Sequence, residues 1–406
     1  MINRLTYIKW LNKHRDKPII KVVSGVRRSG KSTLFSLYKS QLLAQGILEN
    51  QIISINFEDL DYYDYRDFKK LYQYISDQLT DQKTYIFLDE IQHVDQFELV
   101  VDSLFIKDNV DLYLTGSNAY FMSSDLATNL TGRYVELQIL PLSFKEYYSA
   151  QPNTKNKTVE AFYQDYLMSS FPYTAHLTDK SEILDYLRGL YATILLNDVV
   201  NRLGISDIDS LERIFAFVLS NIGSTLSATN IANTLASNKS LVRDKKKTHV
   251  KTVNKYLQGL TDSLLLYRAQ RYQIKDKKLL TTNQKYYVVD VGLRHLLLPQ
   301  NSGDTGHILE NIVYLELLRR NYQVYVGHID DLEVDFYARK ASGEINYIQV
   351  TESLLDEKTR TREFKSLLAI KDAFPKIILT RDRGLSGIDE KGIEVINVFD
   401  WLLEIS

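Results

Sequence analysis

The sequence predicts an α/β multidomain protein that begins with a parallel sheet covered by helices on both faces. Three observations lead to this prediction. The chain has 406 residues, which is too many for one ordinary core. Strand-like and helix-like segments alternate over residues 1–140. The strand-like segments are short apolar runs of the kind that is buried on both faces, which is typical of parallel sheets.

The first part, residues 1–140, supplies the elements of this sheet. Apolar, β-branched runs predict strands at residues 18–25, 50–59, 83–91, 110–118 and 134–142. Apolar residues at helical spacing predict helices at residues 31–46, 68–81 and 97–108.

Three further segments follow along the chain. Residues 141–205 lose the strand signal and predict a helical segment. Residues 206–297 predict three helices and then a short hairpin, which is the order of a winged helix-turn-helix. Residues 298–406 alternate strands and helices again, so we expect a second α/β unit there.

Composition excludes several classes of protein. The net charge is -1, so any nucleic-acid binding must come from a local basic patch. The chain has no cysteine, which excludes disulfides and thiolate metal sites. Its seven histidines do not cluster with carboxylates at zinc spacing. No apolar run reaches the roughly 18 residues that span a bilayer. We therefore expect a cytoplasmic protein without membrane contact.

A phosphate-binding motif follows the first strand. Residues 25–32, Gly-Val-Arg-Arg-Ser-Gly-Lys-Ser, match G-x-x-x-x-G-K-[ST] between an apolar strand and an amphipathic helix. Glycines let the backbone curl so that successive N–H groups face one anion, and the helix start adds its dipole. We therefore expect ATP to contact the loop and the residue after it, namely Gly25, Val26, Arg27, Arg28, Ser29, Gly30, Lys31, Ser32 and Thr33.

The side chains of this loop and of a later strand end suggest specific roles. Lys31 would neutralise the β- and γ-phosphate oxygens, and the Ser32 hydroxyl would bind Mg²⁺. The buried strand in "YIFLDEIQ" ends in Asp89 and Glu90. Asp89 would hold Mg²⁺, and Glu90 would polarise the attacking water as a general base. A further strand between the loop and this acidic pair indicates the additional-strand, catalytic-glutamate branch of P-loop ATPases.

Two more positions could complete this site. The strand in "DLYLTGSNAY" ends in Thr115, Ser117 and Asn118, and a polar side chain there would lie between the acidic pair and the γ-phosphate. We favour Ser117 or Asn118 for this sensor. Arg133 in "LTGRYVEL" is a candidate arginine finger or phosphate sensor, in the same chain or across a subunit interface of a homo-oligomer. Otherwise it is a surface or strand-capping arginine.

These motifs together carry a resemblance to a known family. "SGVRRSGKST", "INFED", "FLDEIQ", "LTGSNAY", "LTGRYVELQILPLSFKEY" and "SSFPY" occur here in that order. The chain resembles the prokaryotic AAA-type ATPases that carry an uncharacterised C-terminal domain. The resemblance implies an ATPase core, a helical segment, a winged helix and a restriction-endonuclease-like C-terminal domain of unknown function. "SSFP" departs from the glycine pair expected before Phe171.

The winged-helix segment contains the most basic run of the chain. "VRDKKKTHVK" precedes and enters the third predicted helix, which would be the recognition helix. The predicted hairpin adds Arg268, Arg271, Lys275, Lys277 and Lys278. Residues 206–297 could thus contact DNA phosphates, or they could serve as a protein-binding module.

The nuclease-like pattern in the last segment is incomplete. Glu310 on a helix, Asp335 on a strand and Gln349 on the next strand match three of its positions, but Thr351 replaces the lysine. Threonine cannot orient and activate water as an ammonium group does, so we expect a degenerate site.

We expect the first of the following three functions and keep the other two as alternatives. The first is an Mg²⁺-dependent ATPase that couples nucleotide state to conformation. The second is a non-hydrolysing, nucleotide-dependent switch that binds DNA or protein. The third is a nucleotide-regulated nuclease.

Overall fold

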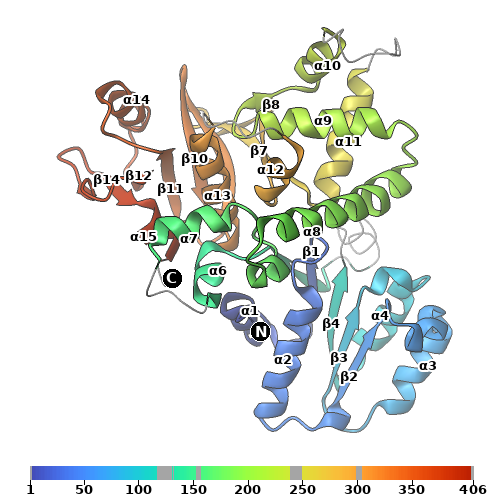
Figure 1. The fold of residues 1–406 in the computed structure, drawn as a ribbon. Helices are drawn as coiled ribbons and strands as arrows, with labels where there is room; N and C mark the ends of the chain where they lie inside the picture. The colour runs from blue at the N-terminus through green and yellow to red at the C-terminus, as the bar shows by residue number, and fades with distance from the viewer. Residues whose placement is uncertain are drawn as a thin grey trace. The chain divides into compact units, whose positions relative to one another are not determined.

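Five parallel strands form the first sheet of the protein, in the order β2-β3-β4-β1-β5 (Figure 1). The strands are β1 (Ile20–Gly25), β2 (Ile52–Asn56), β3 (Thr84–Asp89), β4 (Val110–Gly116) and β5 (Tyr134–Ile139). The structure is a computed structural model and describes residues 2–116, 130, 132–151, 157–237, 249–298 and 304–403. Strand β4 pairs with both β1 and β3, so it separates the loop strand from the strand of the acidic pair. The predicted parallel α/β sheet is confirmed.

Helices cover both faces of this sheet, as the alternating apolar side chains of its strands require. One face packs on α1 (Leu5–His14) and α2 (Lys31–Ala44), with Val23 and Phe87 contributing from the sheet. The opposite face packs on α3 (Phe68–Gln78) and α4 (Phe97–Phe105), with Val22 and Leu88 contributing from the sheet. Short 3₁₀ turns are η1 (Glu49–Gln51), η2 (Leu60–Arg66) and η3 (Ile91–His93). The sheet is therefore buried on both sides, and its strand ends are left to carry the polar residues.

Backbone contacts divide the chain into two units. The first contains Met1–Pro141 with Asp262–Leu264, and the second contains Leu142–Thr261 with Leu265–Ser406.

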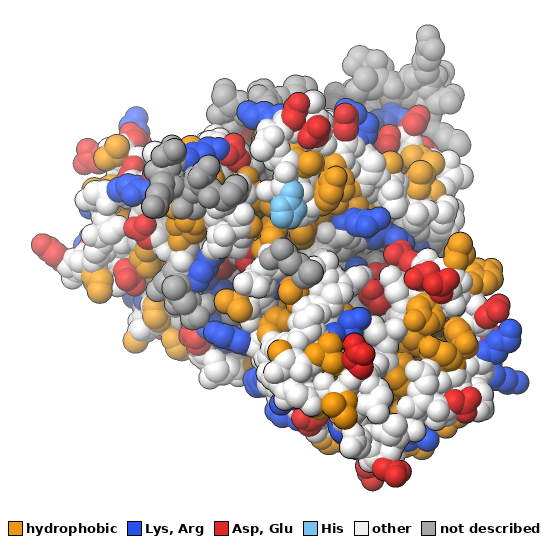
Figure 2. All heavy atoms as spheres, turned by 60° about the horizontal axis from the view of Figure 1, so that its bottom comes forward, with side chains coloured by type: hydrophobic (Ala, Val, Ile, Leu, Met, Phe, Trp, Pro, Cys, Tyr) orange, Lys and Arg blue, Asp and Glu red, His pale blue; other side chains and the backbone are white. Residues whose placement is uncertain are grey.

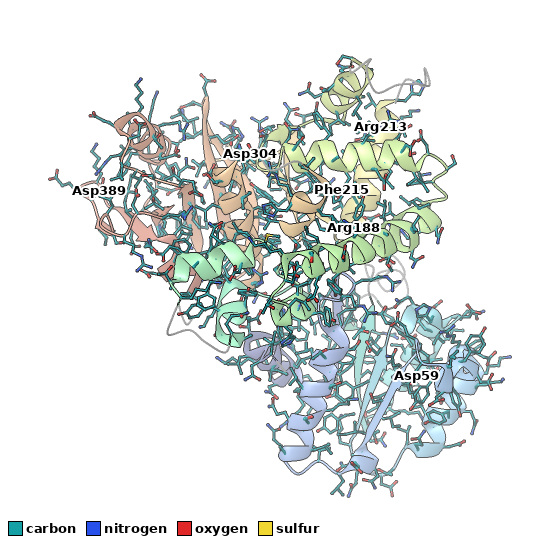
Figure 3. All side chains as sticks on the ribbon, in the orientation of Figure 1. Asp59, Arg188, Arg213, Phe215, Asp304 and Asp389 are labelled. Carbon is teal, nitrogen blue, oxygen red and sulfur yellow. The ribbon has the colours of Figure 1, made fainter. Side chains whose placement is uncertain are left out.

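The second unit contains helices over most of its length. They are α6 (Phe144–Ala150), α7 (Val159–Tyr166), η5 (Pro172–His176), α8 (Lys180–Thr193), η6 (Ile194–Asn201), α9 (Ile208–Ser220), α10 (Ala228–Ser237), α11 (Val250–Asp262), α12 (Gly292–Leu297), α13 (Thr305–Arg319), α14 (Glu357–Leu368) and α15 (Val398–Leu403). Segment η6 is a π-helix that continues α8. Helix α9 is amphipathic: Phe215 is buried and stacks on Tyr191 of α8, while Arg213 is exposed (Figure 3).

A single mixed sheet of nine strands runs through the second unit. Its strands are β6 (Thr225–Leu226), β7 (Leu266–Gln273), β8 (Lys278–Val288), β9 (Gln323–Ile329), β10 (Leu332–Arg339), β11 (Ile345–Thr351), β12 (Lys376–Thr380), β13 (Gly387–Ile388) and β14 (Ile393–Asn397). Their order is β13-β14-β12-β11-β10-β9-β7-β8-β6. Strand β7 of the predicted hairpin pairs in parallel with β9. Strands β7 and β8 precede the predicted boundary at residues 297/298, and β9 to β14 follow it. Strands on both sides of that boundary thus belong to one continuous sheet.

A buried carboxylate holds the backbone at "SSFP". Asp290 is 1% exposed, and it accepts hydrogen bonds from the backbone N–H and hydroxyl of Ser170. It also accepts the N–H of Gly292 at 2.8 Å. A Cβ atom at Gly292 would lie 2.1 Å from the carbonyl oxygen of Met168, so only glycine fits there. Serine hydroxyls and Asp290 therefore fasten this loop to the start of α12.

Within the described ranges, none of the helices is long and apolar enough to cross a membrane. Acidic and basic side chains are interspersed on the face shown in Figure 2, in keeping with the net charge of -1.

Candidate nucleotide-binding site

The phosphate loop connects β1 to α2 at the carboxyl edge of the first sheet. A Cβ atom at Gly25 would lie 2.5 Å from the carbonyl oxygen of Ile139, so the neighbouring strand requires glycine there. Gly30 has φ 102°, a left-handed value that favours glycine, and Lys31 begins the helix directly after it. Both motif glycines are thus explained by the backbone of the loop.

A buried arginine outside the sequence motifs hydrogen-bonds to the backbone of the loop. Arg4 is 4% exposed, and its Nη1 donates to the carbonyl oxygen of Ser29 at 3.0 Å. Its Nη2 donates to the carbonyl oxygen of Leu140 at 2.6 Å. Arg4 therefore ties the loop to the end of β5. No sequence signal marks it, since it lies ahead of every motif.

Lys31 lies on the inner side of the loop. Its Nζ donates to the carbonyl oxygens of Gly25 at 3.3 Å and Val26 at 3.5 Å. The same atom lies 3.3 Å from Oε1 of Glu90, and both side chains are largely buried. The lysine of the loop and the proposed general base are thus brought together, although they are far apart in the sequence.

Thr115 joins the acidic pair to the adjacent strand β4. Its buried hydroxyl donates to Oδ1 of Asp89 and accepts the backbone N–H of Glu90 at 2.8 Å. Glu90 has φ 56°, a left-handed value that a side chain rarely adopts, so the hydrogen bond to Thr115 holds a strained residue. Thr115 was only one of several polar residues at this strand end, and the sequence favoured Ser117 or Asn118. Those two lie outside the described residues.

The acidic pair provides oxygen atoms for a cation. Asp89 is 7% exposed, and burial raises the pKa of its carboxyl group, while hydrogen bonds from Ser32 and Thr115 act in the opposite direction. Ser32 is exposed at the start of α2, so its hydroxyl and the Asp89 carboxylate meet at the rim of the loop. This hydroxyl–carboxylate pair fits an Mg²⁺ ion, which prefers oxygen ligands and keeps several waters.

Gln92 restrains the second carboxylate oxygen of Glu90. Its Nε2 donates to Oε2 of Glu90 from η3, two residues farther along the chain. Glu90 therefore has Lys31 on one carboxylate oxygen and Gln92 on the other. Gln92 lies within the "FLDEIQ" motif, but that motif by itself does not show which way its side chain points.

The two arginines of the loop have different surroundings. Nη1 of Arg27 lies 3.5 Å from Oε1 of Glu58, which follows β2. Arg28 is exposed, with φ 63°. The positive charge of this turn is thus partly offset by Glu58, which follows β2.

Arg133 does not reach this site in its own chain. It precedes β5, and its carbonyl oxygen accepts the N–H of Ile20, the first residue of β1. It therefore lies at the amino edge of the sheet, whereas the phosphate loop follows the carboxyl end of β1. Its side chain forms an ion pair with Asp102 of α4. Arg133 of the same chain is thus paired with Asp102 and is not beside the phosphate loop.

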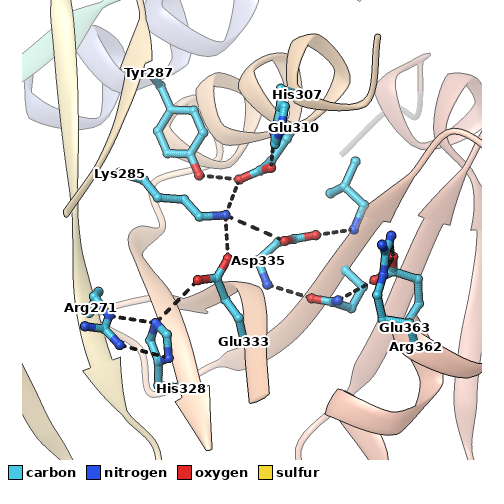
Figure 4. Close-up of polar contacts among 12 residues, drawn as sticks. Arg271, Lys285, Tyr287, His307, Glu310, His328, Glu333, Asp335, Arg362 and Glu363 are labelled. Carbon is cyan, nitrogen blue, oxygen red and sulfur yellow. Dashed lines mark hydrogen bonds and ion pairs between the residues drawn. The ribbon is translucent and has the colours of Figure 1, made fainter. Parts of the chain in front are cut away.

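The three nuclease-like residues lie in the second unit and are brought together there. Glu310 projects from α13 and Asp335 from β10 (Figure 4). Gln349 lies on β11. The side-chain oxygen of Gln349 accepts the backbone N–H of Asp335 at 2.6 Å. Glu310 and Asp335 both lie near the ammonium group of Lys285, from β8.

Comparison with known proteins identifies relatives of the whole chain. An uncharacterized protein of Haemophilus influenzae is 39% identical over 408 residues, covering 100% of this chain and 99% of that protein. An uncharacterized protein of Methanocaldococcus jannaschii is 30% identical over 422 residues, covering 95% of this chain and 88% of that protein. The chain belongs to the family of these proteins.

Segments of this chain are also similar to known domains and to a solved structure. Residues 17–148 match an AAA domain, and residues 159–304 match a domain of unknown function. A Walker-type ATPase of Pyrococcus abyssi has a similar structure, with a TM-score of 0.50 and 14% sequence identity, over 73% of this chain and 96% of that chain. The first unit therefore has the fold of a P-loop ATPase, as its motifs predicted.

Proposed function

We propose that this protein binds ATP and hydrolyses it with the help of Mg²⁺. The observation that supports this most directly is the meeting of Lys31 with Glu90 at 3.3 Å, beside Asp89 and Thr115, at the carboxyl edge of a P-loop sheet. A cation for phosphate, a carboxylate for a metal and a carboxylate for water are the groups that phosphoryl transfer to water requires.

Each side chain has a role in this proposal. Lys31 leaves Glu90 and neutralises the β- and γ-phosphate oxygens. Ser32 and Asp89 would hold Mg²⁺, which when bound would offset the negative charge on the phosphates. Glu90, released from Lys31 and still positioned by Gln92, accepts a proton from the attacking water. Thr115 holds the Asp89 carboxylate and the Glu90 backbone in fixed positions relative to each other.

The experiment measures phosphate release and nucleotide binding on the same proteins. Lys31→Ala should lose both ATP binding and turnover, whereas Glu90→Gln should keep binding and lose turnover. Lys13→Ala, an exposed lysine of α1, is the matched control and should behave as wild type. Turnover that survives Lys31→Ala would disprove the proposal. Equal loss of binding and turnover in Glu90→Gln would limit Glu90 to a structural role.

A second candidate function is nucleotide-dependent binding of DNA or a protein through residues 206–297. The order α9, β6, α10, α11, β7, β8, with β6 paired to β8, supports a winged helix. A groove of about 620 Å³ lies between α11 and the hairpin, and its lining includes Asn254, Gln258, Arg268 and Asn283. Amide and guanidinium groups can read bases or peptide groups.

DNA binding can be tested by fluorescence anisotropy with a labelled duplex, with ATP or ADP present. Lys277 and Lys278 are exposed at the hairpin turn, so Lys277→Ala with Lys278→Ala should weaken binding and reduce its salt dependence. Lys275 forms an ion pair with Asp330 at 2.6 Å, which makes Lys275→Ala the control. If both variants bind as wild type, the hairpin does not contact DNA, and a protein partner becomes the better assignment. Residues Lys245–Lys247 of the basic run lie outside the described residues.

Arg133 can still act across a subunit interface, which requires a homo-oligomer. Its side chain is 45% exposed, so a neighbouring subunit could reach it. Mass measurement with and without ATP, repeated for Arg133→Ala, tests this. An ATP-induced oligomer in which Arg133→Ala lowers turnover supports the assignment, and a monomer under all conditions excludes it. We keep the cytoplasm as the proposed location.

A further inference from the structure

A lysine from another strand fills the centre of the nuclease-like site. In restriction-endonuclease-like folds, a glutamate, an aspartate and a (Glu/Gln)-x-Lys strand surround a divalent metal ion. Here Thr351 stands at the lysine position, and its hydroxyl donates to the carbonyl oxygen of Ser353 at 3.3 Å. Lys285 of β8 instead extends between the carboxylates (Figure 4). Its position was not predictable from the spacing of the motif.

The ammonium group of Lys285 is surrounded by three carboxylates. Nζ lies 2.9 Å from Oε1 of Glu310, 2.8 Å from Oε1 of Glu333 and 3.8 Å from Oδ1 of Asp335. The lysine side chain is 3% exposed. Burial disfavours its charged form, but Glu310, Asp335 and Glu333 outweigh burial and raise the pKa of Lys285 above its usual value. The three carboxylates therefore favour the charged form of Lys285.

The oxygen atoms that would bind a metal already accept hydrogen bonds from protein donors. Oε1 of Glu310 also accepts the hydroxyl of Tyr287 at 2.6 Å, and Oε2 lies 3.6 Å from Nδ1 of His307. Oδ2 of Asp335 accepts the backbone N–H of Val350 at 2.8 Å. A metal ion would have to replace these donors and also repel Lys285.

Gln349, at the third matching position of the motif, also has its side chain hydrogen-bonded to protein groups. The side-chain oxygen of Gln349 accepts the N–H of Asp335, and its Nε2 donates to Oε2 of Glu363 at 2.5 Å. Glu363 in turn forms an ion pair with Arg362. Across the part of the chain that the structure describes, no group of three or more His, Cys, Asp or Glu side chains could hold a metal. The residues of this site do not fit a divalent metal ion.

We propose that Lys285 is the permanent cation of this site, so that the C-terminal unit holds its carboxylates together without metal and does not cleave nucleic acid. The position of Lys285 also gives it a mechanical role. It lies on the β7–β8 hairpin and joins that hairpin to α13 and β10 through Glu310, Glu333 and Asp335. The single positive charge of Lys285 offsets part of the negative charge of these carboxylates, and its removal leaves the buried carboxylate of Glu310 without this cation.

Manganese binding to the full-length, nucleotide-free protein tests the proposal. Asp89→Asn is the parent protein, because that change removes the carboxylate proposed to bind metal beside the phosphate loop. We expect no electron-paramagnetic-resonance signal of bound Mn²⁺ in this parent. Lys285→Met in the same parent should unfold about 10 °C lower and should bind one Mn²⁺, which raises its unfolding temperature. Lys278→Met, an exposed lysine of the same strand, is the control and should match the parent.

Two results would overturn the proposal. One is Mn²⁺ binding by the parent that Glu310→Gln removes, because the metal would then displace Lys285. The other is a Lys285→Met protein that is as stable as Lys278→Met and binds no Mn²⁺. In that case Lys285 would not be needed to offset the charge of the carboxylates. If Lys285→Met does not fold, the comparison of the parent with Glu310→Gln decides. Plasmid nicking by the wild-type protein with Mg²⁺ or Mn²⁺ is expected to be absent, and nicking that Glu310→Gln abolishes would also contradict the proposal.

Discussion

Replacement of Thr115 by valine tests the geometry of the candidate ATP site most directly. Valine has nearly the same shape as threonine but has no hydroxyl group. The change removes the hydrogen bond to the Asp89 carboxylate and leaves the Glu90 N–H, now 2.8 Å from the hydroxyl, without a partner. The fold around the site should otherwise persist.

The expected cost follows from the two lost interactions. A hydrogen bond to a charged group contributes about 1.5–3 kcal/mol, and a buried N–H left unpaired costs about 1–3 kcal/mol. Because the two effects share one side chain, we expect Thr115→Val to lower the free energy of unfolding by about 3 kcal/mol. Thr115→Ser keeps the hydroxyl and loses one methyl group, so this change should lower the free energy of unfolding by about 1 kcal/mol. If half of the 3 kcal/mol is also lost in the transition state, ATP turnover falls about tenfold.

The assay can follow the first unit alone. The chain has two tryptophans, Trp10 in α1 and Trp401 in α15. In a Trp401→Phe protein, the fluorescence of Trp10 reports urea unfolding of the first unit, and phosphate release reports turnover. Thr115→Val with the stability and turnover of Thr115→Ser would refute the reasoning, since the hydroxyl would then position nothing.

Three further predictions concern other parts of the chain. Gly25→Ala should abolish ATP binding, measured by isothermal titration calorimetry, because its Cβ would lie 2.5 Å from a backbone carbonyl oxygen; unchanged binding would show that the loop can move away. Burial, and then Arg66, lowers the pKa of His93 below 6.5, so the unfolded chain binds more protons near that pH. The first unit should therefore become more stable as the pH rises through about 6.5, and His93→Gln should flatten this dependence of the Trp10 urea midpoint. Asp290→Ala leaves the donors of Ser170 and Gly292 unpaired and should destabilise the second unit by about 3 kcal/mol in a Trp10→Phe protein, where an equal loss in the exposed Asp185→Ala would argue against a specific role.

The sequence predicted the parts of the first unit that depend on local patterns. Alternating apolar strands and amphipathic helices identified the layers, and the spacing of Gly25, Gly30 and Lys31 identified the loop. These features are local because a strand, a turn and a helix start each involve neighbouring residues. Helix α1 was not predicted, since nothing in the N-terminal segment resembled a motif.

The features that sequence reasoning missed depend on pairing between distant segments. Arg133 looked close to the site in the sequence, but the strand order places it at the opposite edge of the sheet. Thr115 faces the acidic pair because of the register of β3 and β4. Lys285 enters the nuclease-like site from a strand outside the motif. Register and strand order arise from the whole fold, and one sequence does not encode them in a local pattern.

The parallel pairing of β7 with β9 has a consequence for synthesis of the protein. Arg271 on β7 pairs with Val326 on β9, so β7 leaves the ribosome many residues before its neighbour. At about 5–20 residues per second, a separation of roughly 55 residues corresponds to about 3–11 s. During those seconds, one edge of β7 has no strand beside it and could pair with another chain. The exposed charges of Lys275 and Lys277 at the end of the hairpin discourage such pairing, so the basic turn also protects the nascent chain from aggregation.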